Sequence, residues 1–469
     1  MTPSPAANAL HAPHAPHVLL STLAALCLAC SGAAGGTLDL LESYRAAMAN
    51  HADLLAARAA AEAGREAQPM ARAQLLPTAG LSLGHYRNDL STRTLGAGPA
   101  ADNEQRYTSR SGALVLRQPL YRPAAWAGYR RAQAMVAQAE ATLIQAEQDT
   151  GLQVAQAYFD LLLAREGQLQ MQTQARVIGL QLEAAQRVLA AGQGTRTDVD
   201  DAQARLDLAL AREVVARDTV AQAVQELQAM VQQPVEQIRP LKVDTLRLAA
   251  PDPDQLEHWW QQAEQRSPAI AVLTAQVLGL QADIDRLAAG HRPTLDAILQ
   301  RSVTDRDSIF NPGSTYHNTQ VGLSLNVPLY AGGGVSAQVR QAMAALEEAR
   351  YKLEAKQRQL RNEVRKAFQA VRLGVHKVQA LEQAERSAQQ AVVSSERGLS
   401  ASIRSRLDIL NAQQQLSQAV LELARERLAC LMAQVRLHAL TGGLDETRIQ
   451  QVNQALDLSA SVRPDPYLP

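Results

Sequence analysis

Two stretches of the chain alternate apolar and polar positions with a period of two, which is typical of β-strands that have one apolar side. They cover residues 78–118 and 294–327, and the first contains a Gly-, Pro- and Asp-containing loop near residues 96–103. We predict a β-hairpin in each stretch, with strands of roughly nine to eleven residues. The clearest run places the apolar residues Val321, Leu323, Leu325 and Val327 between Gln320, Gly322, Ser324 and Asn326.

Prolines bound both predicted hairpins. Pro77 and Pro119 flank the first, and Pro293 and Pro328 flank the second. Because proline lacks the amide hydrogen that helices and inner strands use, each of these residues is expected to mark a structural boundary.

The remaining segments have helical periodicity. A helix is predicted before each hairpin, and long helices are predicted after the hairpins over residues 122–191 and 335–400. As one continuous helix, the first of these would reach roughly 100 Å. Shorter helices over residues 197–233 and 404–442 follow, and Thr197 is the predicted N-cap of the first of them.

The same order of elements occurs twice, which predicts an internal tandem repeat. The first repeat covers residues 35–233 and the second residues 254–443, with a linker over 234–253 and a C-terminal tail over 444–469. Eight residues of the first repeat are identical to those 210 positions later: Asp198, Ala202, Gln203, Leu206, Ala209, Arg217, Ala223 and Leu227.

Both shorter helices carry small and apolar residues at alternating spacings of three and four. This spacing is typical of helices packed by knobs into holes, and alanine at alternate layers allows close approach. Cys430 occupies such a position and is interpreted as a small core residue. Glu213 and Glu426 interrupt the two seams; they either set the packing register or face a water-filled interior.

The N-terminal segment resembles an export signal. Residues 18–29 are apolar and are followed by small residues, so residues 1–34 are predicted to be a signal peptide that is cut near Ala33 or Ala34. Cys30 leaves open a lipoprotein cleavage site as the alternative.

Composition narrows the class of protein further. Only 3% of the 469 residues are aromatic, which favours long helices over several compact domains. The 46 basic and 46 acidic residues leave no net charge, which argues against nucleic-acid binding. Three cysteines are too few for a disulfide framework.

The sequence contains no recognisable motif for catalysis, phosphate binding or metal binding. The Gly332-Gly333-Gly334 run is not followed by the Lys of a phosphate-binding loop and is interpreted as a turn. The histidines lack the spacing of metal ligands, and no catalytic triad is legible. We therefore assign no catalytic residue, no metal and no cofactor.

Four strands per chain are too few to close a sheet on itself. Open sheet edges are costly in a bilayer, and the smallest transmembrane barrels have eight strands. Two copies of the chain would supply eight strands and three copies twelve. A barrel of eight strands is filled by side chains, so a water-filled conduit favours the trimer.

The chain resembles the TolC-type outer-membrane channels of efflux pumps and type I secretion systems, from about Thr37 to Gly443. The residues that carry the resemblance are Ala73-Gln74-Leu75-Leu76-Pro77, Gly290-His291-Arg292-Pro293-Thr294-Leu295-Asp296, Val327-Pro328-Leu329-Tyr330-Ala331-Gly332-Gly333 and Arg404-Ser405-Arg406-Leu407-Asp408-Ile409-Leu410-Asn411-Ala412.

This resemblance implies a mainly α-helical fold with a β-barrel portion. It implies a homotrimer, in which four strands per chain form a twelve-stranded barrel in the lipid of a Gram-negative outer membrane. A coiled-coil-like α-helical barrel would continue through the periplasm. A periplasmic adaptor protein and an inner-membrane transporter of the ABC, RND or MFS class are the implied partners, and no enzymatic activity is implied.

The resemblance also places a gate at the periplasmic tip. The matching positions are Thr197 and Asp198 in the first repeat, and Arg404, Asp408 and Asn411 in the second. Arg404 would pair with Asp198 as a latch, and three copies of Asp408 would converge on the axis. The alternative is that both aspartates only stabilise helix starts.

Two departures from the family pattern concern the same gate. Leu399 stands where the family often has Tyr, and Asn411 stands where some members have a second Asp. Outside this family, the competing hypothesis is a periplasmic coiled-coil adaptor or scaffold protein. The sequence leaves the exported substrate open.

Overall fold

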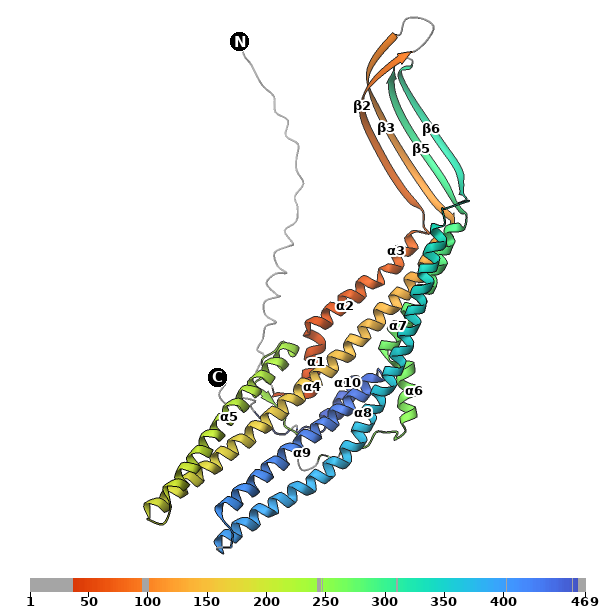
Figure 1. Cartoon of the computed structure of the whole chain (residues 1–469). Helices are drawn as coiled ribbons and strands as arrows, with labels where there is room; N and C mark the ends of the chain where they lie inside the picture. The colour runs from red at the N-terminus through yellow and green to blue at the C-terminus, as the bar shows by residue number, and fades with distance from the viewer. Residues whose placement is uncertain are drawn as a thin grey trace, which may run out of the picture.

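The computed structural model describes residues 37–94, 101–242, 246, 248–308, 311–401, 403–457 and 459–462. The predicted signal peptide and Cys30 lie outside the described residues. Figure 1 shows a curved β-sheet at one end of the molecule and long paired helices that extend away from it.

The sheet has four antiparallel strands. They are β2 (Thr78–Thr94), β3 (Ala101–Tyr121), β5 (Thr294–Ser308) and β6 (Asn311–Asn326). The strand order is β2-β3-β5-β6, so the two hairpins join side by side through β3 and β5. The predicted strand length of nine to eleven residues is wrong, since the strands have 15 to 21 residues. The alternating pattern covers only the part of each strand near the helices, and cross-strand pairing extends the strands through polar sequence beyond it.

Helices make up most of the described chain. Those of the first half are α1 (Leu40–Asn50), α2 (Ala52–Arg65), α3 (Ala67–Ala73), α4 (Pro123–Ala190) and α5 (Arg196–Val231). Those of the second half are α6 (Leu256–Arg266), α7 (Pro268–Ala288), the 3₁₀ turn η1 (Ala289–His291), α8 (Gly334–Ser400), α9 (Arg406–Leu440) and α10 (Glu446–Asn453). The two longest helices have 68 and 67 residues.

The helices that precede the hairpins are segmented, whereas the sequence pattern suggested continuous ones. Ser267 separates α6 from α7 with an extended backbone, because the following Pro268 disfavours a helical conformation in the residue before it. His51 separates α1 from α2 with similar backbone angles. No proline follows His51, and the local sequence does not explain this break.

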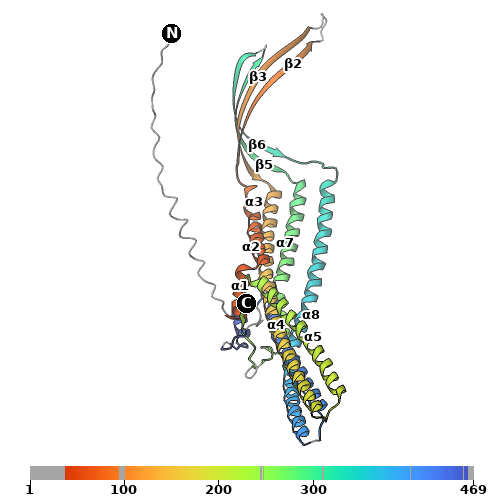
Figure 2. The ribbon, with the colours of Figure 1, turned by 90° about the vertical axis from the view of Figure 1, so that its left-hand side faces the viewer.

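In Figure 1 the first half of the chain lies on one side of the molecule at each level and β6 or α8 on the other, and Figure 2 shows α7 and α8 side by side below the sheet. Near the sheet, α4 packs against α2 and α3 on one side and against α7 on the other, and α7 packs against α8. Farther from the sheet, α4 lies between α5 and α9, and α9 packs against α8. At each level, one lateral edge therefore comes from the first half of the chain and the other edge comes from α8 or β6.

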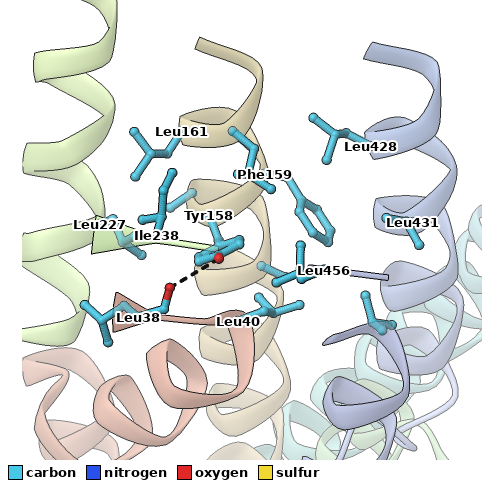
Figure 3. Packing of buried hydrophobic residues seen from close by; sticks show 14 of the residues in the cluster. Leu38, Leu40, Tyr158, Phe159, Leu161, Leu227, Ile238, Leu428, Leu431 and Leu456 are labelled. Atoms are coloured by element: carbon cyan, nitrogen blue, oxygen red, sulfur yellow. Dashed lines mark hydrogen bonds between the residues drawn. The ribbon is translucent and has the colours of Figure 1, made fainter. Parts of the chain in front are cut away.

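The largest core surrounds the middle of α4. There, β1 (Thr37–Leu38) pairs in parallel with β4 (Gln237–Ile238), which lies in the linker between the two halves. Tyr158 of α4 is fully buried beneath these short strands, and its hydroxyl lies 3.0 Å from the carbonyl oxygen of Arg239 and 3.3 Å from that of Leu38. Figure 3 shows Leu227, Leu431 and Leu456 in the same cluster.

The helical seams behave as packing surfaces. Cys430 is confirmed as a small core residue, because it is 1% exposed and packs on Gly374 of α8. A Cβ atom at position 374 would lie only 3.1 Å from the Cys430 sulfur. Glu426 accepts a hydrogen bond from Lys377 of α8 at 2.6 Å, which raises the pKa of that lysine. The carboxylate in the second seam thus links α9 to α8.

Within the described residues, no helix taken alone combines the length and hydropathy needed to cross a bilayer. The bent pair α6 and α7 passes that test only when the two segments are taken together.

Candidate functional site

The register of the four strands separates the sheet into two faces. One face, called here the apolar face, carries Ala79, Leu81, Leu83, Leu114, Leu116, Leu295, Ala297, Leu299, Val321, Leu323 and Leu325. The opposite face, called here the polar face, carries Thr78, Gly80, Ser82, Ser111, Ala113, Gln300, Ser302, Gln320, Gly322 and Ser324. The division is the one found in transmembrane barrels, where lipid-facing and lumen-facing residues alternate.

The side chains of the apolar face are uncovered in the single chain. Leu81, Leu83, Val321, Leu323 and Leu325 are between 64% and 78% exposed. Monomeric soluble proteins rarely expose a contiguous apolar surface of this extent, which marks a membrane or protein contact.

The apolar band crosses the strands obliquely. Leu81 is the centre of the apolar run on β2. A line drawn from it straight across the strands passes through its successive cross-strand partners, Leu114 on β3, Arg301 on β5 and Thr319 on β6. The apolar run on β6 is centred on Leu323, four residues farther along. At about 3.4 Å per residue, the band is displaced by four residues along the strands over the three strand spacings of about 4.8 Å between β2 and β6. The strands are therefore tilted by roughly 43° from the line perpendicular to the band. Strands of transmembrane barrels are tilted by about 35–45°.

The sheet is open at both sides. The order β2-β3-β5-β6 makes β2 and β6 edge strands, each with one row of unpaired backbone groups among the described residues. Such an edge is a template for pairing with another strand, and a bilayer makes an unpaired edge prohibitively costly.

A buried carboxylate joins the sheet to the helices. Asp296 of β5 is 7% exposed, and its two oxygens accept hydrogen bonds from Nε and Nη2 of Arg122 at 2.9 and 2.7 Å. Arg122 is the residue that precedes α4. Arg117 of β3 places its Nε 3.6 Å from the same carboxylate. This two-pronged pairing fixes the start of α4 against β5.

The four boundary prolines lie where the sheet meets the helices. Pro77 and Pro293 directly precede β2 and β5, and Pro328 follows β6 by two residues. Pro119 instead lies inside β3, at a bulge in its pairing with β5. A bulge is one of the few strand positions where proline is tolerated.

At the far end of the molecule, both predicted gate aspartates cap helices. Asp408 is the third residue of α9, and its Oδ2 accepts hydrogen bonds from the backbone nitrogen and the hydroxyl of Ser405 at 2.8 and 2.9 Å. These bonds, with Arg404 nearby, lower the pKa of Asp408. Asp198 has the same relation to Thr195 at the start of α5. Thr195 is therefore the N-cap, and the prediction that Thr197 fills this role is wrong, because α5 begins one residue before Thr197.

Arg404 lies beside its own helix start. Its Nη1 is 4.0 Å from Asp408, and its stem lies across Gly398, where a Cβ atom would come within 2.5 Å of it. Among the described residues of this single chain, no ion pair joins Arg404 to Asp198. Asn411 lies exposed on α9, one turn beyond Asp408.

Arg406, and not Arg404, is among the residues that line the cavity beside Asp198. This cavity of about 380 Å³ is lined by residues of α4, by Asp198 and Asp201 of α5, and by Arg406 and Leu407 of α9. Arg406 was missed, although the offset of 210 residues relates it to Arg196 at the start of α5.

In the part of the chain that the structure covers, no group of three or more His, Cys, Asp or Glu side chains is arranged to hold a metal ion.

Comparison with known proteins agrees with this geometry. The model of the family described as "Outer membrane efflux protein" matches residues 43–231 and 259–443. The proteases secretion protein PrtF of Dickeya chrysanthemi is 31% identical over 421 residues, covering 88% of this chain and 90% of PrtF. The alkaline protease secretion protein AprF of Pseudomonas aeruginosa is also 31% identical, covering 88% of this chain and 86% of AprF.

The fold has close relatives among solved structures. The CmeC outer membrane channel of Campylobacter jejuni superimposes with a TM-score of 0.74 over 96% of this chain and 99% of CmeC, at 16% identity. That likeness shows the fold alone. The two matches of the family model and the two relatives at 31% identity identify this chain as a member of the outer membrane efflux protein family.

Proposed function

We propose that this outer-membrane exit duct is a homotrimer in which three open sheets close into one twelve-stranded barrel. The β6 edge of one copy would pair with the β2 edge of the next. The apolar face would then contact lipid, and the polar face would line a water-filled lumen. The oblique apolar band supports this arrangement, because a closed barrel requires tilted strands.

The helices extend the same ring into the periplasm. At every level, one lateral edge of the chain comes from its first half and the other edge from β6 or α8. One repeated head-to-tail contact between copies would therefore close both the sheet and the helices into rings. The outer edge of α5 or α2 in one copy would meet α8 of its neighbour. The exposed apolar residues Leu208 and Val215 on α5 suit such a contact.

The two matches of the family model support a tandem repeat. We propose repeats over residues 35–233 and 254–443, joined by the linker 234–253 and followed by the tail 444–469. The linker and tail add β4 and α10, respectively, to the core around α4.

The duct is proposed to be passive, without enzymatic activity, cofactor or nucleic-acid partner. An adaptor and an inner-membrane transporter would open it. Because the two relatives at 31% identity are named for protease secretion, we propose a secreted polypeptide as the substrate and an ABC transporter as the energy source.

We assign the closed gate to the helix tips. Thr197, Asp198, Arg404, Asp408 and Asn411 all lie at the starts of α5 and α9 or in the loop before α9. Capping holds the Asp408 carboxylate in one orientation with its charge retained, which suits a fixed acidic ring that attracts cations.

Single-channel recordings test the gate. Asp408→Ala is expected to weaken block by multivalent cations, and Arg404→Ser is expected to raise basal conductance. Wild-type values in both variants would remove these residues from the gate.

The observation that carries the proposal is the two-faced, open-edged sheet. If three sheets pool their strands, the protein partitions with outer membranes, and unheated samples migrate on denaturing gels differently from boiled ones. A periplasmic adaptor or scaffold would remain in the soluble periplasmic fraction and migrate identically before and after heating.

A further inference from the structure

Few of the described side chains on the polar face of the sheet are charged. Apart from Arg117 and Asp296, the described side chains of this face are uncharged, and most are small or carry a hydroxyl or an amide. Both charged residues lie at the end of the sheet next to the helices. Among the described side chains of the polar face, charge is therefore confined to the base of the sheet.

The charges at this base do not cancel. Asp296 is already paired with Arg122 through two hydrogen bonds of 2.9 and 2.7 Å. Arg117 is a second cation beside the same carboxylate, at 3.6 Å, and its side chain is 49% exposed. Two guanidinium groups against one carboxylate leave one positive charge per chain, and Arg117 is the cation that faces open space.

We propose that Arg117 is a selectivity-determining residue of the duct. The proposal rests on the proposed trimer, in which three copies of Arg117 would form a ring of positive charge at the inner end of the barrel lumen. Such a ring favours anions and the acidic side chains of a passing polypeptide, as arginine and lysine rings do in anion pores. Because the described side chains farther along this face are uncharged, salt is the main screen of this charge, over about 30 Å at 0.01 M ionic strength.

A merely structural role for Arg117 makes a different prediction. Asp296 keeps its bidentate partner Arg122 when Arg117 is removed, so the junction between β5 and α4 should persist. Arg117→Gln should therefore leave assembly intact and change only the ion preference. Arg117→Lys keeps the charge while losing the guanidinium geometry, so it should behave like the wild type.

The test is the reversal potential of the purified full-length protein in planar bilayers, with a KCl gradient at low ionic strength. Arg117→Gln is expected to shift the anion-to-cation permeability ratio roughly twofold toward cations, and Arg117→Glu farther. The matched control is Arg106→Gln, because Arg106 lies near the tip on the other face and pairs with Asp89 at 3.0 Å. This control should leave the ratio unchanged.

Each outcome bears on one claim. Identical reversal potentials for the wild type and both Arg117→Gln and Arg117→Glu would overturn the selectivity role. Loss of the heat-sensitive assembly in Arg117→Gln would also overturn it, because Arg117 would then be part of the scaffold. Identical gel migration of the unheated and boiled wild-type protein would instead contradict the proposed duct.

Discussion

At the scale of single residues, buried polar groups in the core around α4 give the clearest expectations. The hydroxyl of Tyr158 donates to the carbonyl of Arg239 and accepts from its backbone nitrogen at 3.2 Å. Tyr158→Phe removes the hydroxyl from the Arg239 carbonyl, while the Arg239 nitrogen keeps its 3.3 Å hydrogen bond to the Leu38 carbonyl, and the expected cost is about 1–3 kcal/mol. Denaturant unfolding checks this, with Tyr351→Phe as the control because Tyr351 is 63% exposed. Equal losses for both variants would contradict the assignment.

A second residue predicts a pH dependence. Burial, with a smaller contribution from Arg448, lowers the pKa of His438 to about 4. The unfolded chain binds the proton below about pH 6.5, whereas the folded chain does so only near pH 4, so stability falls as pH drops through this window. The loss attributable to His438 is roughly 3 kcal/mol.

His438→Gln tests that expectation. Its stability should vary less between pH 6.5 and 4 than that of the wild type, as followed by thermal unfolding at several pH values. Parallel pH profiles for the two proteins would show that His438 does not titrate in this way. Below pH 4 and above pH 6.5 the two profiles should run parallel, because folded and unfolded states then bind the same number of protons at this site.

At the scale of elements, the junction between sheet and helix depends on one ion pair. Arg122→Ala leaves Asp296 buried with only the more distant Arg117 beside it, and removal of one partner of a buried pair typically costs about 3–5 kcal/mol. Thermal unfolding should show this loss, and the double variant Arg122→Ala with Asp296→Ala should recover part of it. A double variant no more stable than Arg122→Ala would contradict the pairing argument.

An element could be predicted from the sequence when the interactions that determine it are local. The hairpins and long helices were readable because periodicity and proline act locally. Strand ends were not, because the polar outer parts of β2 and β3 are strands only through their mutual pairing. The break at Ser267 is readable from Pro268, whereas the break at His51 has no local signal.

The helix tips show how a small boundary error moves a site. The pattern Thr195-Arg196-Thr197-Asp198 is a capping box, and Ser405 with Asp408 repeats it. Each helical residue turns about 100°, so choosing a cap two positions late reverses the direction in which a neighbouring side chain points. For the same reason, the sequence alone does not say which arginine near the start of α9 lines the cavity beside Asp198; in the structure it is Arg406.

At the scale of the whole molecule, the chain is incomplete as a membrane protein. Its apolar face is exposed, both sheet edges are open, and each level from sheet to helix tip ends in one edge from each half. A single copy buries its helical core, but in lipid the backbone groups at the two edges of its sheet would have no hydrogen-bond partners. Association is therefore expected to be obligatory, with no stable membrane-inserted monomer.

Native mass spectrometry of the protein extracted from outer membranes in mild detergent tests this central claim most directly. Three copies of the mature chain in one complex are predicted, since twelve strands form a barrel wide enough to hold water. A folded single copy that remains stable in buffer without detergent would contradict the account.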